Sequence, residues 1–270
     1  MNIILSFVKK YYALYQRSNF PRASAAMTHF MTMTFFPLII CLYTLLGNSY
    51  AKAMSVLRFA ETFVSPETVK VIEEFLGYVA RNHSSAMMIA GLTLLATSSS
   101  AALRTLQITI GEMQGGQRYT GVMFFLFSVA FSVMIVAALY FGIVVMLTGN
   151  VFINWLNAYV PFFDISNSWN TLRFIVFGGI EFIIFLGIYA VCMPANGAYT
   201  VWPGALVSTA ATVGVSVIFS VFISASAKYP LVYGSLASII LLMFWLYLTC
   251  MVIYCGAAIN IVIRDMKNET

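Results

Sequence analysis

Long uncharged runs of apolar residues dominate the chain, and the short segments between them hold most of the charge. A run of about 20 apolar residues is long enough to cross the hydrocarbon core of a bilayer as a helix. Six such spans are predicted: His29–Gly47, Ala86–Leu103, Gly121–Thr148, Leu172–Met193, Trp202–Ala225 and Tyr233–Ile263. The runs are continuous rather than alternating, which is typical of membrane helices. The predicted fold class is therefore all-α, with residues 1–270 forming a single six-helix transmembrane domain.

Two amphipathic segments outside the spans predict surface helices. In the first, apolar side chains recur at helical spacing from Ile4 to Tyr15, while Lys9, Lys10 and Arg17 supply charge. This pattern fits an interfacial helix on the cytoplasmic leaflet, or a plain amphipathic elbow before the first span. The second segment follows Pro66 and has one apolar stripe, made of Val69, Ile72, Leu76 and Val79. It predicts an external helix that covers the bundle by ordinary packing, with a lid over a cavity as the alternative.

Composition and charge agree with the membrane class and add an orientation. Hydrophobic residues make up 61% of the chain and charged residues 9%, against roughly 25% charged in soluble domains. The amino-terminal segment, the connection between the second and third spans and the tail hold eight basic and three acidic residues, a net charge of +5. The opposite side holds six basic and five acidic residues, a net of +1. Because Lys and Arg are retained in the cytoplasm, both termini are predicted to be cytoplasmic, and the basic excess is no nucleic-acid-binding surface.

Glu181 is the one acidic residue deep in a predicted span, near the centre of the fourth run. An acidic residue at that depth costs roughly 2.5 to 3.5 kcal/mol on insertion scales. Two interpretations stay open. Glu181 is either a protonatable or cation-binding group facing an internal cavity, or a hydrogen-bonded packing residue that fixes a neighbouring helix.

The fifth span carries a hydroxyl group at every fourth residue, namely Ser208, Thr212, Ser216, Ser220 and Ser224. Steps of four place these residues along one slowly drifting ridge of a helix. With Glu181, the ridge is the candidate substrate path. Small hydroxyl residues at this spacing also allow membrane helices to approach closely, and the same packing role is predicted for Gly178 and Gly179.

Other candidate chemistry is sparse. Arg104 follows three serines at the cytoplasmic boundary of the second span, where it fits a lipid-phosphate contact or an ordinary positive-inside anchor. His29 and His83 fall at opposite ends of the predicted topology. The four cysteines, Cys41, Cys192, Cys250 and Cys255, all lie in apolar runs, where a thiol usually acts as a small buried hydrophobe. No catalytic, metal or cofactor site and no disulfide is predicted, so an enzyme is not expected.

Short motifs spread along the chain resemble those of the YihY/BrkB family of membrane proteins, historically labelled ribonuclease BN. The residues that carry the resemblance are Pro37, Pro203, Gly204, Tyr229, Tyr233, Gly234, Ser235, Trp245, Gly256 and Asn260. The resemblance implies a six-helix protein of the bacterial cytoplasmic (inner) membrane with both ends inside. The family typically has an acidic residue before the final Ile/Leu-Asn of its closing motif, where this chain has Ala258. A mechanism that rests on that carboxylate is therefore in doubt here.

The leading functional hypothesis is transport or flipping of a lipid or other amphiphile. The alternative is a non-transporting envelope scaffold. A nuclease is rejected, because the catalytic histidines and carboxylates that a metal-dependent nuclease needs are missing from the sequence. A polar cavity that reaches the membrane midplane favours transport, and a tight, dry interior favours the scaffold. Membrane lipids are the expected partners, with no nucleic acid and no cofactor, and a homo-oligomer stays open.

Overall fold

All regular structure in the described part of the chain is helical, which confirms the all-α class there. The computed structural model describes residues 3–45, 49–60, 66–82, 84–116, 122, 125, 126, 128, 129, 165–193, 200–225 and 236–269. The helices are α1 (Ile3–Arg17), α2 (Phe20–Leu45), α3 (Tyr50–Ala60), α4 (Pro66–Asn82), α5 (Ser85–Gln114), α7 (Ile165–Cys192), α8 (Trp202–Ala225) and α10 (Leu236–Lys267).

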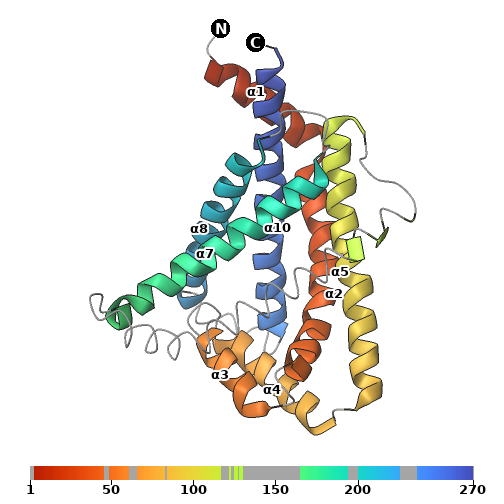
Figure 1. The fold of residues 1–270 in the computed structure, drawn as a ribbon, viewed down its shortest axis with the longest axis vertical. Coiled ribbons are helices and arrows are strands. Elements are labelled where there is room, and N and C mark those ends of the chain that lie inside the picture. Colours follow the sequence, from red (N-terminus) through yellow and green to blue (C-terminus); the bar gives the residue numbers. More distant parts are fainter. Residues whose placement is uncertain are drawn as a thin grey trace.

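The long helices form a bundle whose two chain ends lie at the same end (Figure 1). Helices α2, α5, α8 and α10 run along the long axis of the molecule, and α7 crosses them obliquely. Helix α1 lies across the end that holds both termini, while α3 and α4 lie at the opposite end. This arrangement agrees with the predicted placement of both termini on one side of the membrane.

The protein is a multi-pass membrane protein, and the described part of the chain contains four helices that are long and apolar enough to cross a bilayer. These spans are Phe20–Thr44, Ser85–Gln114, Trp202–Phe219 and Ile239–Lys267. The predicted count of six is not confirmed. Most of the third predicted span, Gly121–Thr148, lies outside the described residues. The fourth run forms α7, whose apolar segment Gly178–Cys192 is shorter than a full span where its side chains are described.

Helices α2, α5, α7 and α10 each extend beyond the predicted span at one end or both, and α3 was not predicted at all. Helix α2 begins at Phe20, nine residues before the predicted start of the first span. Helix α5 continues past Leu103 to Gln114, because Leu106, Ile110 and Met113 of the added turns are buried in the core. It stops at Gly115, which has a φ of 80° and whose N–H donates to the Glu112 carbonyl over 3.3 Å. A left-handed glycine after the last turn is a common way to end a helix.

The main core lies where α2, α5, α7 and α10 meet. Its largest fully buried side chains are Phe20, Met27, Leu106, Tyr189 and Tyr254. This core lies in the half of the bundle nearer to the termini, since these residues come from the ends of their helices on that side. It holds the helices together around the candidate site.

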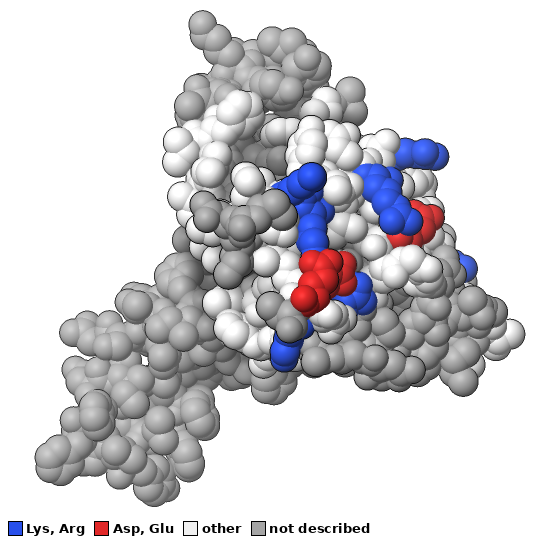
Figure 2. Space-filling view, turned by 90° about the horizontal axis from the view of Figure 1, so that it is seen from above, with Lys and Arg blue, Asp and Glu red and all other residues white. Residues whose placement is uncertain are grey.

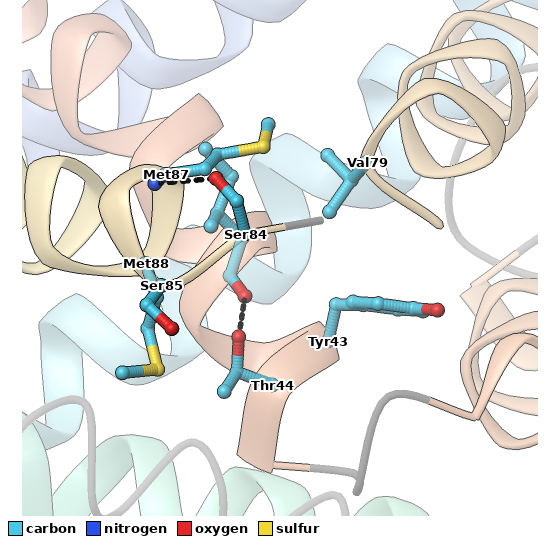
Figure 3. Close-up of a pocket in the computed structure, with 8 residues that line it drawn as sticks. Tyr43, Thr44, Val79, Ser84, Ser85, Met87 and Met88 are labelled. Carbon is cyan, nitrogen blue, oxygen red and sulfur yellow. Dashed lines mark hydrogen bonds between the residues drawn. The ribbon is translucent and has the colours of Figure 1, made fainter. Parts of the chain in front are cut away.

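A second core joins α4 to the far end of α2 and confirms the predicted stripe on α4. Val69, Leu76 and Val79 are buried, and Ile72 packs against the same cluster. Beside it, α2, α4 and α5 leave a pocket of about 100 Å³ (Figure 3). Such a volume holds only about three waters. The packing interpretation of α4 therefore fits better than a lid over a large cavity.

Helix α1 has two unlike faces, as the interfacial prediction requires. Tyr11, Leu14 and Tyr15 pack against the main core, whereas Ile4 is 78% exposed and Val8 is also exposed. Burial raises the pKa of the Tyr11 hydroxyl, as does a hydrogen bond with Cys255. An apolar face that nothing in the described residues covers is typical of a helix lying in the membrane interface.

Candidate functional site

Helices α8 and α10 cross at a point where two glycines meet. A Cβ atom on Gly204 would overlap the Gly256 carbonyl oxygen and the Asn260 side chain. A Cβ atom on Gly256 would in turn overlap the Ser208 hydroxyl and the Tyr189 hydroxyl. No other residue fits at either position without moving a helix. The two backbones therefore lie as close as membrane helices with small interface residues can lie.

Asn260 of α10 caps the amino terminus of α8. Its Oδ1 accepts a 2.7 Å hydrogen bond from the Gly204 N–H, and its Nδ2 donates to the Val201 carbonyl over 3.1 Å. The first N–H groups of a helix have no partner within the helix, and Pro203 has no N–H to satisfy. Asn260 is 1% exposed, so these bonds form away from water. A side chain from another helix thus does the work of a local cap.

Ser208, in the next turn of α8, lies at the same helix crossing. Its Oγ lies 2.6 Å from the Tyr189 hydroxyl, which donates to the Ile253 carbonyl over 2.8 Å. Both side chains are fully buried. We call the set Tyr189, Gly204, Ser208, Gly256 and Asn260 the glycine joint. Its polar groups are satisfied by one another or by backbone, which makes it a packing element rather than a path.

Thr212, one turn further along α8, differs from Ser208. It is 6% exposed, yet its hydroxyl has no hydrogen-bond partner among the described residues. Glu181 of α7 is half-buried, and its side chain lies near enough to that of Thr212 for the two to interact. The structure thus brings together two of the predicted path residues, and leaves both with unused hydrogen-bonding capacity. We call Glu181 and Thr212 the carboxyl notch.

The remaining hydroxyls of the ridge divide between packing and the undescribed part of the chain. Ser216 accepts a 3.2 Å hydrogen bond from the indole N–H of Trp245. Ser220 and Ser224 lie on α8, but their side chains fall outside the described residues. The predicted common face therefore exists at least from Ser208 to Ser216, where it is directed towards α7 and α10. Its members have three different environments rather than one continuous wet surface.

No helix among the described residues packs closely against Gly178 or Gly179, so their predicted packing role stays a prediction. No atom among them lies within 4 Å of where a Cβ atom would stand on either glycine. Gly178 precedes Glu181 by three residues and so shares its face of α7.

Comparison with known proteins identifies the family of the chain. Residues 11–270 match the family model described as Virulence factor BrkB. The chain belongs to the BrkB family. It is 24% identical over 269 residues to a protein of Bacillus subtilis (strain 168) whose name calls it ribonuclease-like protein YfkH, with 97% of each chain covered. No solved structure matches.

The glycine joint explains why the BrkB-type motifs occur together. Pro203, Gly204, Gly256 and Asn260 come from two distant stretches of sequence and meet at one helix crossing. Pro37 is buried inside α2. Four further motif residues, Tyr229, Tyr233, Gly234 and Ser235, lie outside the described residues. Ala258, where the family typically has an acidic residue, is fully buried in the main core.

Arg104 lies on α5, and Tyr189 lies at the crossing of α8 and α10. Arg104 is half-buried on α5, where its Nε donates to the Ser100 carbonyl over 3.4 Å and its guanidinium lies 5.6 Å from the Phe125 ring centroid. Its contact with a lipid phosphate stays a prediction. Tyr189 was missed, because a tyrosine in an apolar run looks like any other core aromatic. Only its partner across the helix crossing reveals its role.

Proposed function

We propose that this BrkB-family protein moves a lipid or another amphiphile across the bacterial cytoplasmic membrane, with the carboxyl notch as the holding site. The observation that carries the proposal is the environment of the Glu181 side chain. Glu181 is half-buried in the apolar helical segment Gly178–Cys192, and the nearby buried hydroxyl of Thr212 has no hydrogen-bond partner of ordinary geometry among the described residues. Ionisable groups inside a bilayer are costly and usually mark a substrate or ion pathway.

Only two residues of the predicted substrate path are assigned to substrate. The hydroxyl of Ser208 is hydrogen-bonded with the Tyr189 hydroxyl, and the hydroxyl of Ser216 accepts a hydrogen bond from the Trp245 indole. A hydroxyl that is already hydrogen-bonded within the protein has less capacity to form a hydrogen bond with a substrate. Glu181 and Thr212 are therefore the members of the path that we assign to substrate.

We also propose that both termini face the cytoplasm. Figure 2 looks down on the end of the bundle that holds them, and Lys and Arg side chains spread over this face around a few acidic ones. The described basic residues of this end include Lys9, Lys10, Arg17, Arg22, Arg264 and Lys267. This is the distribution that the positive-inside rule associates with the cytoplasmic side.

The proposed role is transport rather than catalysis, and it needs neither nucleic acid nor a cofactor. The Bacillus subtilis relative is named ribonuclease-like, but that name describes another protein. Of the two histidines here, His29 is exposed on α2, and His83 lies outside the described residues. An RNA-cleavage assay with the purified protein is expected to give no product above the background of a mock purification.

A non-transporting scaffold is the second candidate, and the glycine joint favours it. Helices held together by mutual close contact and satisfied polar groups suit a rigid bundle. The two candidates differ in what Glu181 does. In a scaffold it is a tolerated packing residue, so a neutral isostere leaves the function of the protein unchanged.

Translocation in vesicles tests the proposal. The purified full-length protein is reconstituted with fluorescent lipid, and the fraction of label that an impermeant quencher reaches is followed with time. Wild-type protein is expected to speed exchange between leaflets, and Glu181→Gln to slow it at least about tenfold, or about 1.4 kcal/mol in barrier height. Glu73→Gln, an exposed acid on α4, serves as the matched control and should behave as wild type. Wild-type vesicles that match empty ones would overturn the proposal.

A further inference from the structure

Helix α1 carries two parallel stripes of exposed side chains on the side that does not pack against the bundle. Ile4, Val8 and Tyr12 recur every four residues, and their exposed fractions are 78%, 54% and 60%. Lys9 and Arg17, which are eight residues apart, are exposed as well. Because steps of four keep residues on one face of a helix, the apolar stripe and the basic stripe run side by side. We call these five residues the α1 outer face.

The other side of α1 holds the outer face in a fixed orientation. Leu14 and Tyr15 pack against the main core, and the Tyr15 ring centroid lies 5.1 Å from that of Phe20 at the start of α2. Lys10 forms an ion pair with Glu269, which follows α10. Helix α1 is therefore anchored on α2 and on the end of α10, and the outer face cannot turn inwards without breaking these contacts.

The position of α1 along α10 places the outer face at the level of the lipid headgroups. Helix α10 is uncharged from Leu236 to Ile263, or about 42 Å of helix. A bilayer with its headgroup regions is about 40–45 Å thick, so Arg264, which ends this stretch, lies at the boundary between membrane and water. Lys10 of α1 meets Glu269 just past the last turn of α10, and α1 lies across this end of the bundle (Figure 1).

The basic stripe has no counter-charge among the described residues. Lys9 and Arg17 form no ion pair there, and Glu112, which lines a groove beside Arg17, is not within ion-pair distance of it. The acidic side chains of the tail are both paired, Asp265 with Arg264 and Glu269 with Lys10. The described side chains at this end comprise six basic and three acidic ones, a net charge of +3, as Figure 2 shows. Such a surface is attracted to anionic headgroups.

We propose that the α1 outer face docks onto anionic phospholipids of the adjacent leaflet. The apolar stripe enters the boundary between headgroups and acyl chains, and the two basic side chains lie against lipid phosphates. Such helices are held at a membrane by buried apolar area and by attraction to anionic lipids. A zwitterionic leaflet supplies only the first of these, so α1 docks more tightly on an anionic one. The inference goes beyond the proposed function, because the carboxyl notch takes no part in it.

Hydrogen exchange of α1 in the full-length protein tests this preference. The protein is placed in nanodiscs of phosphatidylcholine, either alone or mixed with phosphatidylglycerol of the same acyl chains. Deuterium uptake by the amides of Ile3–Arg17 is followed by mass spectrometry, because exchange reports how often a segment opens. We expect phosphatidylglycerol to slow this exchange at least about tenfold, the scale set by two basic residues at an anionic surface. Nanodiscs expose both leaflets, so the result does not depend on the orientation of the protein in the cell.

A matched pair of double variants tests the basic stripe. Lys9→Gln combined with Arg17→Gln should remove the difference in α1 exchange between the two lipid mixtures. Lys52→Gln combined with Arg58→Gln changes the same two residue types at exposed positions on α3, at the opposite end of the bundle. This control is expected to retain the wild-type difference. Thermal unfolding of each variant checks that the fold is kept.

A second pair of variants tests the apolar stripe. Val8→Thr should speed α1 exchange about threefold in both lipid mixtures, because it removes apolar area without changing charge. Val213→Thr makes the same change at an exposed position of α8 and should leave α1 exchange at the wild-type rate. Equal rates for wild type and Val8→Thr would show that the apolar stripe is not inserted in the membrane.

Three further outcomes would overturn the proposal. Equal α1 exchange in the two mixtures, or a difference that survives the loss of both basic side chains, excludes the anionic preference. Slowing by free glycerol phosphate as strong as that by phosphatidylglycerol assigns the basic stripe to a soluble anion. Protection that appears only in nanodiscs with two copies of the protein assigns the outer face to a second copy. Since none of these measurements follows translocation, this inference and the proposed function can fail independently.

Discussion

The glycine joint and the carboxyl notch lie one turn apart on α8, yet they use similar residues in opposite ways. Ser208 and Thr212 are both buried hydroxyls on the same face of the helix. The hydroxyl of Ser208 bonds with Tyr189, whereas that of Thr212 has no partner among the described residues. In the glycine joint the polar groups form hydrogen bonds that hold the helices together. In the carboxyl notch the polar groups have no such bonds among the described residues. In a membrane helix, a regular ridge of hydroxyls therefore says little until the partner of each one is known.

The largest expected effect comes from filling the glycine joint. Gly256→Ala places a methyl group against the Ser208 and Tyr189 hydroxyls and 2.8 Å from the Gly204 carbonyl oxygen. We expect a loss of about 3 kcal/mol or more of stability, because backbone has to move. Gly214→Ala on α8 is the matched control, since its Cβ meets no described atom within 4 Å. Thermal unfolding of the two purified variants measures the difference, and equal melting temperatures would refute the joint.

Removing the cap on α8 should have the next largest effect. Asn260→Leu leaves the Gly204 N–H and the Val201 carbonyl buried without their partner. The expected cost is about 2 kcal/mol, the penalty for unsatisfied buried polar groups. Asn268→Leu, an exposed position just after α10, controls for the change of residue. A melting temperature for Asn260→Leu within error of wild type would show that Asn260 does not cap α8.

Removing one hydroxyl from each region tests the contrast between the glycine joint and the carboxyl notch. Ser208→Ala breaks the contact with Tyr189 and should cost about 1 kcal/mol. Thr212→Val removes a hydroxyl that bonds to nothing described, so we expect a stability equal to wild type or slightly higher. Lipid binding should show the reverse order, with Thr212→Val the weaker binder. The contrast between the two regions fails if both variants lose stability alike.

The smallest effect is expected at Ser216. Its hydrogen bond to the Trp245 indole is 3.2 Å long and half-buried, so Ser216→Ala should cost only about 0.5 kcal/mol. The tryptophan emission maximum is a sensitive readout, because the indole N–H loses its acceptor. Trp202→Phe in both backgrounds removes one exposed tryptophan and sharpens the signal. An unchanged spectrum would argue against this bond.

The sequence predicted elements better than it predicted contacts. The bounds of α8 match the predicted fifth span, and the apolar stripe of α4 is buried as expected. Hydrophobic pattern reports what a segment buries, so these features can be read from one stretch at a time. The start of α2 at Phe20 was missed, since a span search detects only the part of a helix that lies in hydrocarbon.

Contacts between distant segments could not be derived from the same pattern. Gly204 and Asn260 are separated by 56 positions, and no local spacing links them. Gly178 and Gly179 allow close helix packing, but whether another helix arrives depends on the oblique course of α7. The pairing of Glu181 with Thr212, rather than with Ser208 or Ser216, likewise depends on where α7 crosses α8. Resemblance to a family marked the joint, but only the geometry distinguished it from the notch.

The docking of α1 on α10 also bears on the order in which the protein is made. Lys10 forms an ion pair with Glu269, and Tyr11 bonds with Cys255. More than 200 residues separate the end of α1 from the start of α10. At about 5 to 20 residues per second, a ribosome needs at least about ten seconds to deliver this partner. Helix α1 can therefore reach its docked position only after α10 has been synthesised.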